Sequence, residues 1–275
     1  MSGVSAKKID FRHLHLGDVG STNAELLVRA SAGEEPGLWL TADRQLTGRG
    51  RRGRAWTSEP GNLYASLLLV DPAEPGLLGS LPLAVAVAVH DAIAAVLPPQ
   101  GGRLSIKWPN DVLIDGAKTS GILIESEFLP DGRQAVVIGC GINVAHHPNA
   151  DGYASTCLHA RGTSVSAQEL FAHLFMTMER ALDTWDRGRG IAAVRDQWLA
   201  RAAGIGGQIA VRLPDSEIHG LFSGIDGDGR LLLTLPDGGH RTFAAGDVFL
   251  PAAPIAEQDP TRPQTTTSYS SRSAG

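Results

Sequence analysis

The chain has few cysteines, few aromatic residues and no excess of positive charge, and each shortage excludes a class of protein. Only two cysteines, Cys140 and Cys157, occur among 275 residues, so no disulfide framework holds the fold together. Lys and Arg number 24 against 29 Asp and Glu, whereas a general nucleic-acid binder would be basic overall. No uninterrupted apolar run reaches the ~18 residues of a membrane span, and no signal-peptide apolar region opens the chain. We therefore expect a cytoplasmic protein with reduced thiols that binds neither DNA nor a membrane.

Metal-ligand spacing is absent as well. Cys140, His146, His147, Cys157 and His159 lie within twenty positions, but they contain no compact C-x-x-C or H-x-x-x-H pair. We expect unpaired cysteines and surface histidines here, and no metal site.

Arginine and glycine are instead concentrated in one segment, residues 48–54, which reads GRGRRGR. A guanidinium binds carboxylate or phosphate oxygens in a bidentate way, and glycine lets a backbone approach a ligand closely. The segment also fits the letters G-x-G-x-x-G of a dinucleotide fingerprint. That fingerprint requires a helix directly after it, whereas residues 54–61 end in the turn signal Pro60-Gly61 and have no helical period. The pattern therefore predicts a flexible loop that closes over a small anionic ligand.

Strand and helix patterns alternate along the chain and change character after Gly204. Capping boxes at Thr22–Glu25 and Ser166–Glu169 each predict the start of a helix. After Gly204, short alternating strands separated by Asp-Gly turns predict a small β-barrel of SH3-like type. We expect a catalytic domain over residues 1–203, an SH3-like domain over 204–252 and a disordered tail over 253–275. The predicted strands are 38–41, 63–70, 104–108, 112–114, 121–128, 135–138, 208–213, 218–225, 231–235 and 240–243, and the predicted helices are 22–30, 80–97, 166–185 and 192–203.

Five motifs follow one another in a fixed order. They read GSTN at 20–23, QLTGRGRRGRAW at 45–56, KWPND at 107–111, KTSGILIE at 118–125 and GCGINV at 139–144. In this order and spacing the chain resembles the biotin–protein ligases from about residue 17 to residue 250. The resemblance implies an α+β fold, with a mixed-sheet catalytic domain of the biotin/lipoate protein ligase type followed by the SH3-like barrel.

The resemblance also implies a two-step reaction. Biotin and Mg²⁺-bound ATP give biotinyl-5′-AMP and pyrophosphate, and a lysine of a biotin carrier domain, such as that of acetyl-CoA carboxylase, then attacks the mixed anhydride and releases AMP. Many relatives carry an N-terminal winged helix-turn-helix of ~60 residues. Only twenty residues precede Ser21, so we expect a ligase without the repressor role.

The matched motifs give each residue an expected role. The neutral, polar ureido ring of biotin needs short hydrogen-bonding side chains, and the meeting of the biotin carboxylate with the α-phosphate needs cations. The expected catalytic residues are Lys118, Arg51, Asp111 and Lys107. The expected biotin-binding residues are Ser21, Thr22, Asn23, Gln45, Arg49, Gly50, Arg51, Lys118 and Gly121, and the expected ATP-binding residues are Gly48, Arg52, Arg54, Trp56, Lys107, Asn110 and Asn143.

Plainer interpretations stay open for several of these residues. Residues 21–23 also fit a simple helix N-cap, Lys118 an exposed turn lysine, Trp56 core burial and Asp111 a turn cap. A lipoate–protein ligase shares the catalytic fold, although its usual Arg-Arg-x-x-Gly-Gly-Gly segment is missing. A nucleic-acid-binding protein that clamps phosphates with the arginine loop is the alternative from another class. We expect a monomer or a weak homodimer.

Overall fold

The structure is a computed structural model that describes residues 9–148, 154–244 and 246–250. The predicted disordered tail lies outside the described residues.

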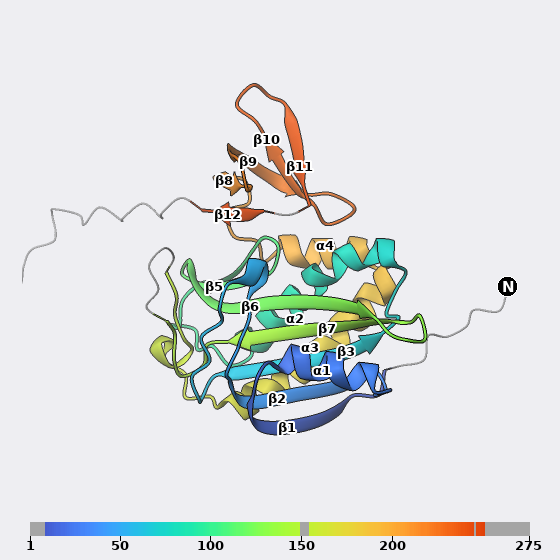
Figure 1. The fold of residues 1–275 in the computed structure, drawn as a ribbon. Helices are drawn as coiled ribbons and strands as arrows, with labels where there is room; N and C mark the ends of the chain where they lie inside the picture. Colours follow the sequence, from blue (N-terminus) through green and yellow to red (C-terminus); the bar gives the residue numbers. More distant parts are fainter. Residues whose placement is uncertain (1–8, 149–153, 245, 251–275) are drawn as a thin grey trace, which may run out of the picture.

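Seven strands form one mixed sheet in the order β1-β2-β3-β7-β6-β5-β4 (Figure 1). The β1 and β2 strands run parallel, and every other neighbouring pair in this sheet is antiparallel. The strands are β1 Arg12–Val19, β2 Leu38–Gln45, β3 Leu63–Val70, β4 Leu104–Lys107, β5 Asp111–Ile114, β6 Ala117–Phe128 and β7 Gln134–Ile142.

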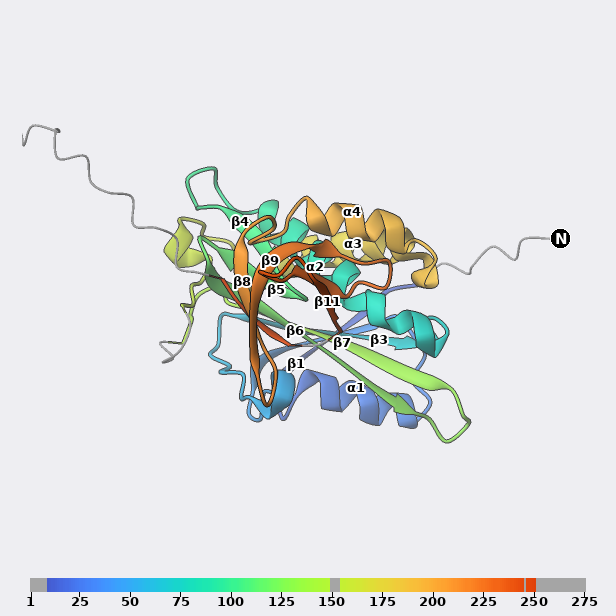
Figure 2. The same ribbon diagram turned by 90° about the horizontal axis from the view of Figure 1, so that it is seen from above.

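Helices cover both faces of this sheet (Figure 2). One face carries α1, Thr22–Ser31, which packs on β3 and β7, and the other carries a layer of three helices. Because the central strand β3 is covered on both faces, seven of its eight residues are buried, which explains its uninterrupted apolar pattern. The helices of the second layer are α2 Leu81–Ala94, α3 Ala167–Trp185 and α4 Ile191–Leu199.

One helical stretch, Pro75–Ala94, is long and apolar enough to cross a membrane by length and composition alone. The sequence interpretation predicted a buried helix over residues 80–97 but no candidate membrane span, because Ser80, His90 and Asp91 interrupt the apolar run. Its main part, α2, packs against α3, α4 and the sheet, and ten of its fourteen residues are buried. Burial in the protein core therefore accounts for its hydropathy.

Several predicted boundaries need correction. The N-cap of α1 is Ser21 and not Thr22, because the Ser21 side chain accepts from the backbone N–H of Ala24 at 3.5 Å. The α4 helix ends at Leu199, four residues earlier than predicted, because the chain then pairs with β4. There the Ala203 N–H donates to the Ile106 carbonyl at 2.8 Å. The Ser166–Glu169 capping box at α3 is confirmed.

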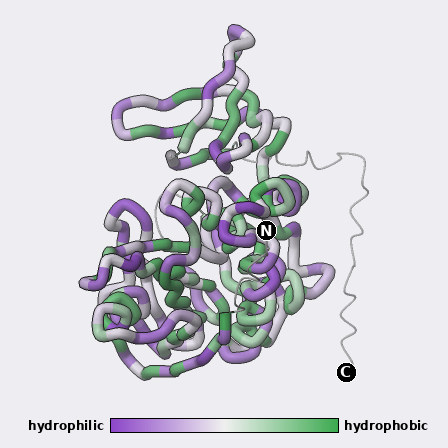
Figure 3. Tube along the Cα trace, turned by 90° about the vertical axis from the view of Figure 1, so that its right-hand side faces the viewer, coloured by the Kyte–Doolittle hydropathy of each residue, from purple (hydrophilic) through white to green (hydrophobic). Residues whose placement is uncertain are grey.

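A second, antiparallel sheet of five strands follows, in the order β11-β10-β9-β8-β12, so the predicted α+β class is confirmed. Figure 3 shows this sheet above the helix and sheet layers, with hydrophobic segments in both parts. Indole Nε1 of Trp108 donates to the Gly229 carbonyl at 3.2 Å, and Arg195 Nε donates to the Ile225 carbonyl at 2.7 Å, which fixes the small sheet on the larger part. The strands are β8 Gln208–Arg212, β9 Glu217–Ile225, β10 Leu231–Thr234, β11 His240–Phe243 and β12 Asp247–Phe249.

Candidate active site

A cavity of about 720 Å³ lies where the start of α1, the arginine loop, strands β5 to β7 and the C-terminal sheet meet. All but four of the predicted site residues line it, and the exceptions are Gly48, Arg52, Asn110 and Asn143. The sequence motifs therefore converge on one cavity. The lining residues that were predicted are Ser21, Thr22, Asn23, Gln45, Arg49, Gly50, Arg51, Arg54, Trp56, Lys107, Asp111, Lys118 and Gly121.

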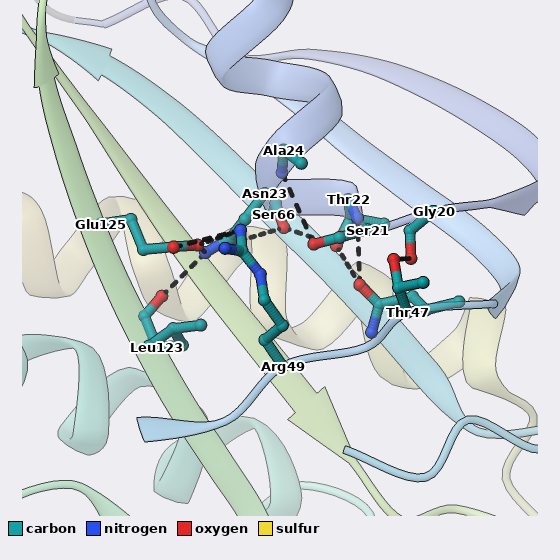
Figure 4. Close-up of polar contacts among 11 residues, drawn as sticks. Gly20, Ser21, Thr22, Asn23, Ala24, Thr47, Arg49, Ser66, Leu123 and Glu125 are labelled. Carbon is teal, nitrogen blue, oxygen red and sulfur yellow. Dashed lines mark hydrogen bonds and ion pairs between the residues drawn. The ribbon is translucent and has the colours of Figure 1, made fainter. Parts of the chain in front are cut away.

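The N-terminus of α1 contributes one polar part of the cavity lining, whose contacts are shown in Figure 4. The backbone N–H and the hydroxyl of Thr22 both donate to Gln45 Oε1 at 3.0 Å. Ser66 Oγ lies 2.7 Å from Thr22 Oγ1 and 2.6 Å from Asn23 Oδ1. Ser21 therefore caps the helix, as the plainer interpretation holds, while its neighbours form a buried network beside the cavity.

A carboxylate that was not predicted to act completes this network. Asn23 Nδ2 donates to Glu125 Oε2 at 2.9 Å and to the Leu123 carbonyl at 3.2 Å. Arg49 Nη2 lies 3.1 Å from Glu125 Oε1, so the first arginine of the loop is drawn toward β6 (Figure 4). Glu125 thus links the helix start to the arginine loop.

A second polar part of the cavity lining is a carboxylate between two lysines. Asp111 Oδ1 lies 2.7 Å from Lys118 Nζ, and its Oδ2 lies 3.3 Å from Lys107 Nζ. All three side chains are between 17% and 24% exposed, so their charges are only partly screened by water. Burial raises the pKa of Asp111, but the two ammonium groups outweigh it, and the resulting pKa lies below the ordinary value. Asp111 is therefore ionised near neutral pH.

Each of the four loop arginines has a partner. Arg51 Nη1 donates to Asn110 Oδ1 at 3.1 Å, while Arg52 and Arg54 lie 3.1 and 2.6 Å from Asp247 Oδ2. Arg49 pairs with Glu125, so the four positive charges contact three different acceptors, Glu125, Asn110 and Asp247. The mutual repulsion of four neighbouring positive charges is therefore offset in this structure. The next element after the loop is strand β3 and not a helix, which confirms the sequence argument against a dinucleotide fingerprint.

Glycines let Trp56 lie flat against the sheet. A Cβ on Gly141 would come within 2.6 Å of the Trp56 ring, and one on Gly121 within 2.9 Å. Lys118 Nζ lies 5.7 Å from the centre of the same ring. The buried Nε1 of Trp56 has no hydrogen-bond partner among the described residues, so it can donate to a ligand. Trp56 is thus part of the cavity wall and not of the apolar core.

Two of the predicted ATP-binding residues are buried outside the cavity lining, so their roles in nucleotide binding stay predictions. Asn143 is 3% exposed; its N–H donates to the Thr119 carbonyl at 2.8 Å and its Nδ2 to the Thr156 carbonyl at 3.1 Å. Asn110 is 4% exposed, and its Oδ1 accepts a hydrogen bond from Arg51 Nη1 at 3.1 Å. A role for Asn143 in nucleotide binding stays a prediction.

Sequence reasoning missed several residues that line the cavity. Arg212 of β8 stacks on Phe249 of β12 at 4.1 Å, and Asp247 lies next to them. Tyr64 of β3 also lines it; burial raises the pKa of its phenol to about 12. The β12 strand is only three residues long and has no period to signal it, whereas Glu125 stands inside a quoted motif and could have been assigned.

Among the described residues, neither cysteine belongs to a group of side chains that could hold a metal ion. Cys140 and Cys157 are both buried and free, and burial raises the pKa of the Cys140 thiol to about 12. Across residues 9–148, 154–244 and 246–250, no three His, Cys, Asp or Glu side chains form a group that could hold a metal ion.

Comparisons with known proteins agree with this site. Residues 19–143 match the model of the biotin/lipoate A/B protein ligase family, and residues 204–250 match the biotin protein ligase C-terminal domain. The chain is 38% identical over 238 residues to the biotin–[acetyl-CoA-carboxylase] ligase of Paracoccus denitrificans, covering 83% of this chain and 96% of that one. It is 32% identical to the bifunctional ligase/repressor of Bacillus subtilis, covering 85% of this chain and 73% of that one.

A solved structure extends the likeness to the fold. The biotin protein ligase of Aquifex aeolicus, in complex with biotin and ATP, superposes with a TM-score of 0.72 at 27% identity and covers 86% of this chain and 97% of its own. The C-terminal match and the identity over most of the chain favour the biotin ligases over the lipoate ligases that share the catalytic fold. The chain belongs to the biotin protein ligase family.

Proposed function

We propose that the chain activates biotin with ATP to biotinyl-5′-AMP, releasing pyrophosphate, and then transfers biotin to a lysine of a carrier protein. The observation that carries this proposal is that one cavity is lined both by a polar network at the start of α1 and by a Lys118–Asp111–Lys107 group. The polar network suits a neutral polar ring, and the lysine–aspartate group suits a carboxylate and a phosphate.

Biotin is proposed to bind with its ureido ring toward the start of α1. Gln45, Thr22 and Asn23 supply amide and hydroxyl groups there, and Trp56 supplies a flat apolar wall above Gly121 and Gly141. Its carboxylate then points toward Lys118 and the loop arginines.

Adenylation requires a carboxylate to attack phosphorus in a polyanion. A biotin carboxylate oxygen forms a bond to the α-phosphorus of ATP, and the bond from that phosphorus to the bridging oxygen of pyrophosphate breaks. Lys118 and Arg51 are proposed to stabilise the charge that gathers between the two anions. Mg²⁺ is proposed to arrive as part of the ATP complex, coordinated chiefly by phosphate oxygens.

Transfer requires a neutral amine. The carrier lysine, whose ordinary pKa is ~10.4, attacks the anhydride carbonyl, AMP leaves, and one proton is released. Asp111 is proposed to accept a hydrogen bond from this amine and orient it. Its lowered pKa makes it a weak proton acceptor, so orientation is the larger part of its role.

The carrier is proposed to be a biotin carrier domain such as that of acetyl-CoA carboxylase. This follows the Paracoccus denitrificans relative, whose name specifies that enzyme. We further propose that the chain acts in the cytoplasm as a monomer or weak homodimer and without DNA.

Purified protein, MgATP, biotin and a biotin carrier domain test the function directly. Mass spectrometry should find the carrier heavier by one biotinyl group, with AMP formed in equal amount. A product mixture containing ADP, or no adduct, would contradict the proposal. Lipoate in place of biotin distinguishes the lipoate ligase, and a thermal shift with oligonucleotide distinguishes the nucleic-acid binder.

A further inference from the structure

Three arginines of the loop contact two consecutive residues at the start of β12. Arg52 Nη1 and Arg54 Nη2 lie 3.1 and 2.6 Å from Asp247 Oδ2, and Arg51 Nη2 donates to the Gly246 carbonyl at 3.4 Å. The loop and Asp247 are more than 190 positions apart in sequence. The reaction assigns no role to Asp247, yet it faces the cavity.

The strand that carries Asp247 is fixed in place. Val248, its neighbour, is 3% exposed and belongs to the main core, and Asp247 pairs in register with Arg212 of β8. Gly246 lies so close to β8 that a Cβ there would come within 2.9 Å of Val211. The Asp247 carboxylate is 21% exposed and stands at a defined position at the mouth of the cavity.

The loop has little else to hold its outer part. Residues 52–55 are exposed, and Arg52 has a φ of 57°, a left-handed conformation that residues other than glycine seldom adopt. Internal hydrogen bonds, such as Gly50 N–H to the Arg54 carbonyl at 2.6 Å, keep its shape without attaching it to the body. The two inner arginines, Arg49 and Arg51, contact Glu125 and Asn110. Asp247 is therefore the carboxylate that holds the two outer arginines, Arg52 and Arg54.

We propose that Asp247 is a positioning residue that keeps the arginine loop over the cavity before the nucleotide binds. It acts through Arg52 and Arg54, which stay on Asp247 while Arg49 and Arg51 are directed toward the ligands. The C-terminal sheet then sets the fraction of molecules in which the loop already lies over the cavity when ATP binds. The proposal rests on the proposed function only in naming ATP as the ligand.

The first test measures the loop without ligands. Hydrogen exchange of residues 48–56 should be about fivefold faster in Asp247→Asn than in the parent, because two exposed ion pairs on one carboxylate are lost. Asp247→Glu should restore slow exchange. Asp215→Asn, which removes an equal charge from the exposed β8–β9 turn, should leave it unchanged.

A double-variant cycle shows whether Asp247 acts through the arginines. Arg52→Gln with Arg54→Gln should speed exchange as much as Asp247→Asn does, and combining all three should add nothing. Unchanged exchange in Asp247→Asn, equal acceleration in Asp215→Asn, or full additivity would each overturn the proposal. These readouts need no catalysis, so they remain decisive if the ligase assignment fails.

The second test uses the kinetics of adenylation. Asp247→Asn should raise KM for ATP about fivefold and leave the rate at saturating ATP within about twofold, because only the loop equilibrium changes. A lower KM in Asp247→Asn would mean that Asp247 competes with phosphate for the arginines and would overturn the proposal. Loss of the saturated rate with normal KM would assign Asp247 to the chemistry and overturn it as well.

Discussion

Replacing Lys118 by alanine should slow formation of biotinyl-5′-AMP by on the order of a hundredfold. Its ammonium lies 2.7 Å from Asp111 and 5.7 Å from the centre of Trp56, inside the cavity where carboxylate and phosphate must meet. Removing one pre-positioned group that stabilises developing charge costs about 3 kcal/mol, which corresponds to this factor in rate.

The expected loss of rate in Lys118→Ala follows from two opposing electrostatic effects. A unit charge about 4 Å from an anion is worth roughly 4 kcal/mol at the effective dielectric constant of a protein surface. Asp111 already neutralises part of the Lys118 charge, which reduces what the substrate gains. The side chain is only 19% exposed, so water replaces the lost ammonium poorly. A hundredfold loss is therefore more reasonable than a tenfold or a ten-thousandfold loss.

Pyrophosphate release in a single turnover, at saturating biotin and ATP, measures this step. Lys118→Arg should recover part of the rate because it keeps the charge but changes its geometry. Without Lys118, Asp111 keeps only the ion pair with Lys107. The melting temperature of each variant shows whether this loss destabilises the fold. A folded Lys118→Ala enzyme that forms biotinyl-5′-AMP at the parent rate would refute the assignment.

The remaining predictions concern the same cavity. Asp111→Asn should slow transfer from preformed biotinyl-5′-AMP more than it slows adenylation; a defect in adenylation alone would indicate nucleotide binding instead. Folding lowers the pKa of Asp111, so the ionised carboxylate stabilises the fold above its unfolded pKa of about 4, and this stabilisation is lost as the pH falls through the lower folded value. The melting temperature of Asp111→Asn should therefore fall less than that of the parent as the pH is lowered below about 4. Gly141→Ala should weaken biotin binding about tenfold by displacing Trp56, measured by calorimetry against Gly17→Ala, where an added Cβ meets nothing within 4 Å. Arg51→Gly should release biotinyl-5′-AMP into solution and label bystander lysines, seen by mass spectrometry; retention equal to the parent would show that Arg51 does not hold the intermediate.

The strands with strong apolar patterns could be predicted from the sequence, and the polar start of one strand could not. The β3 bounds were predicted to the residue. The β6 strand begins at Ala117, four residues before its predicted start. The prediction missed these residues because three of them, 118–120, are polar. Thr119 and Ser120 are nonetheless fully buried; Ser120 Oγ donates to the Gly141 carbonyl at 2.9 Å. For Ser120 this hydrogen bond to strand β7 compensates for burial, and a local sequence pattern does not contain it; the Thr119 hydroxyl has no hydrogen-bond partner among the described residues.

The sequence motifs indicated the cavity-lining residues that are neighbours in sequence and did not indicate their partners across the fold. Arg49 and Arg54 were recognised as anion ligands from their own segment. Their partners Glu125 and Asp247 lie 76 and 193 positions away, on strands that only the topology brings to the loop. A motif therefore indicates what a residue can bind, while the fold determines what it does bind in the ligand-free protein.

The same difference changes how the arginine loop is understood. Taken alone, four arginines among glycines would repel one another, and only a ligand could order them. In the structure the inner pair faces Glu125 and Asn110 of the catalytic layers, whereas the outer pair faces Asp247 of the C-terminal sheet. Binding of the adenylate then has less disorder to overcome, because part of the ordering is already present. The arginines, although alike in sequence, thus have different partners in the fold, and we propose that only the inner pair contacts the ligands.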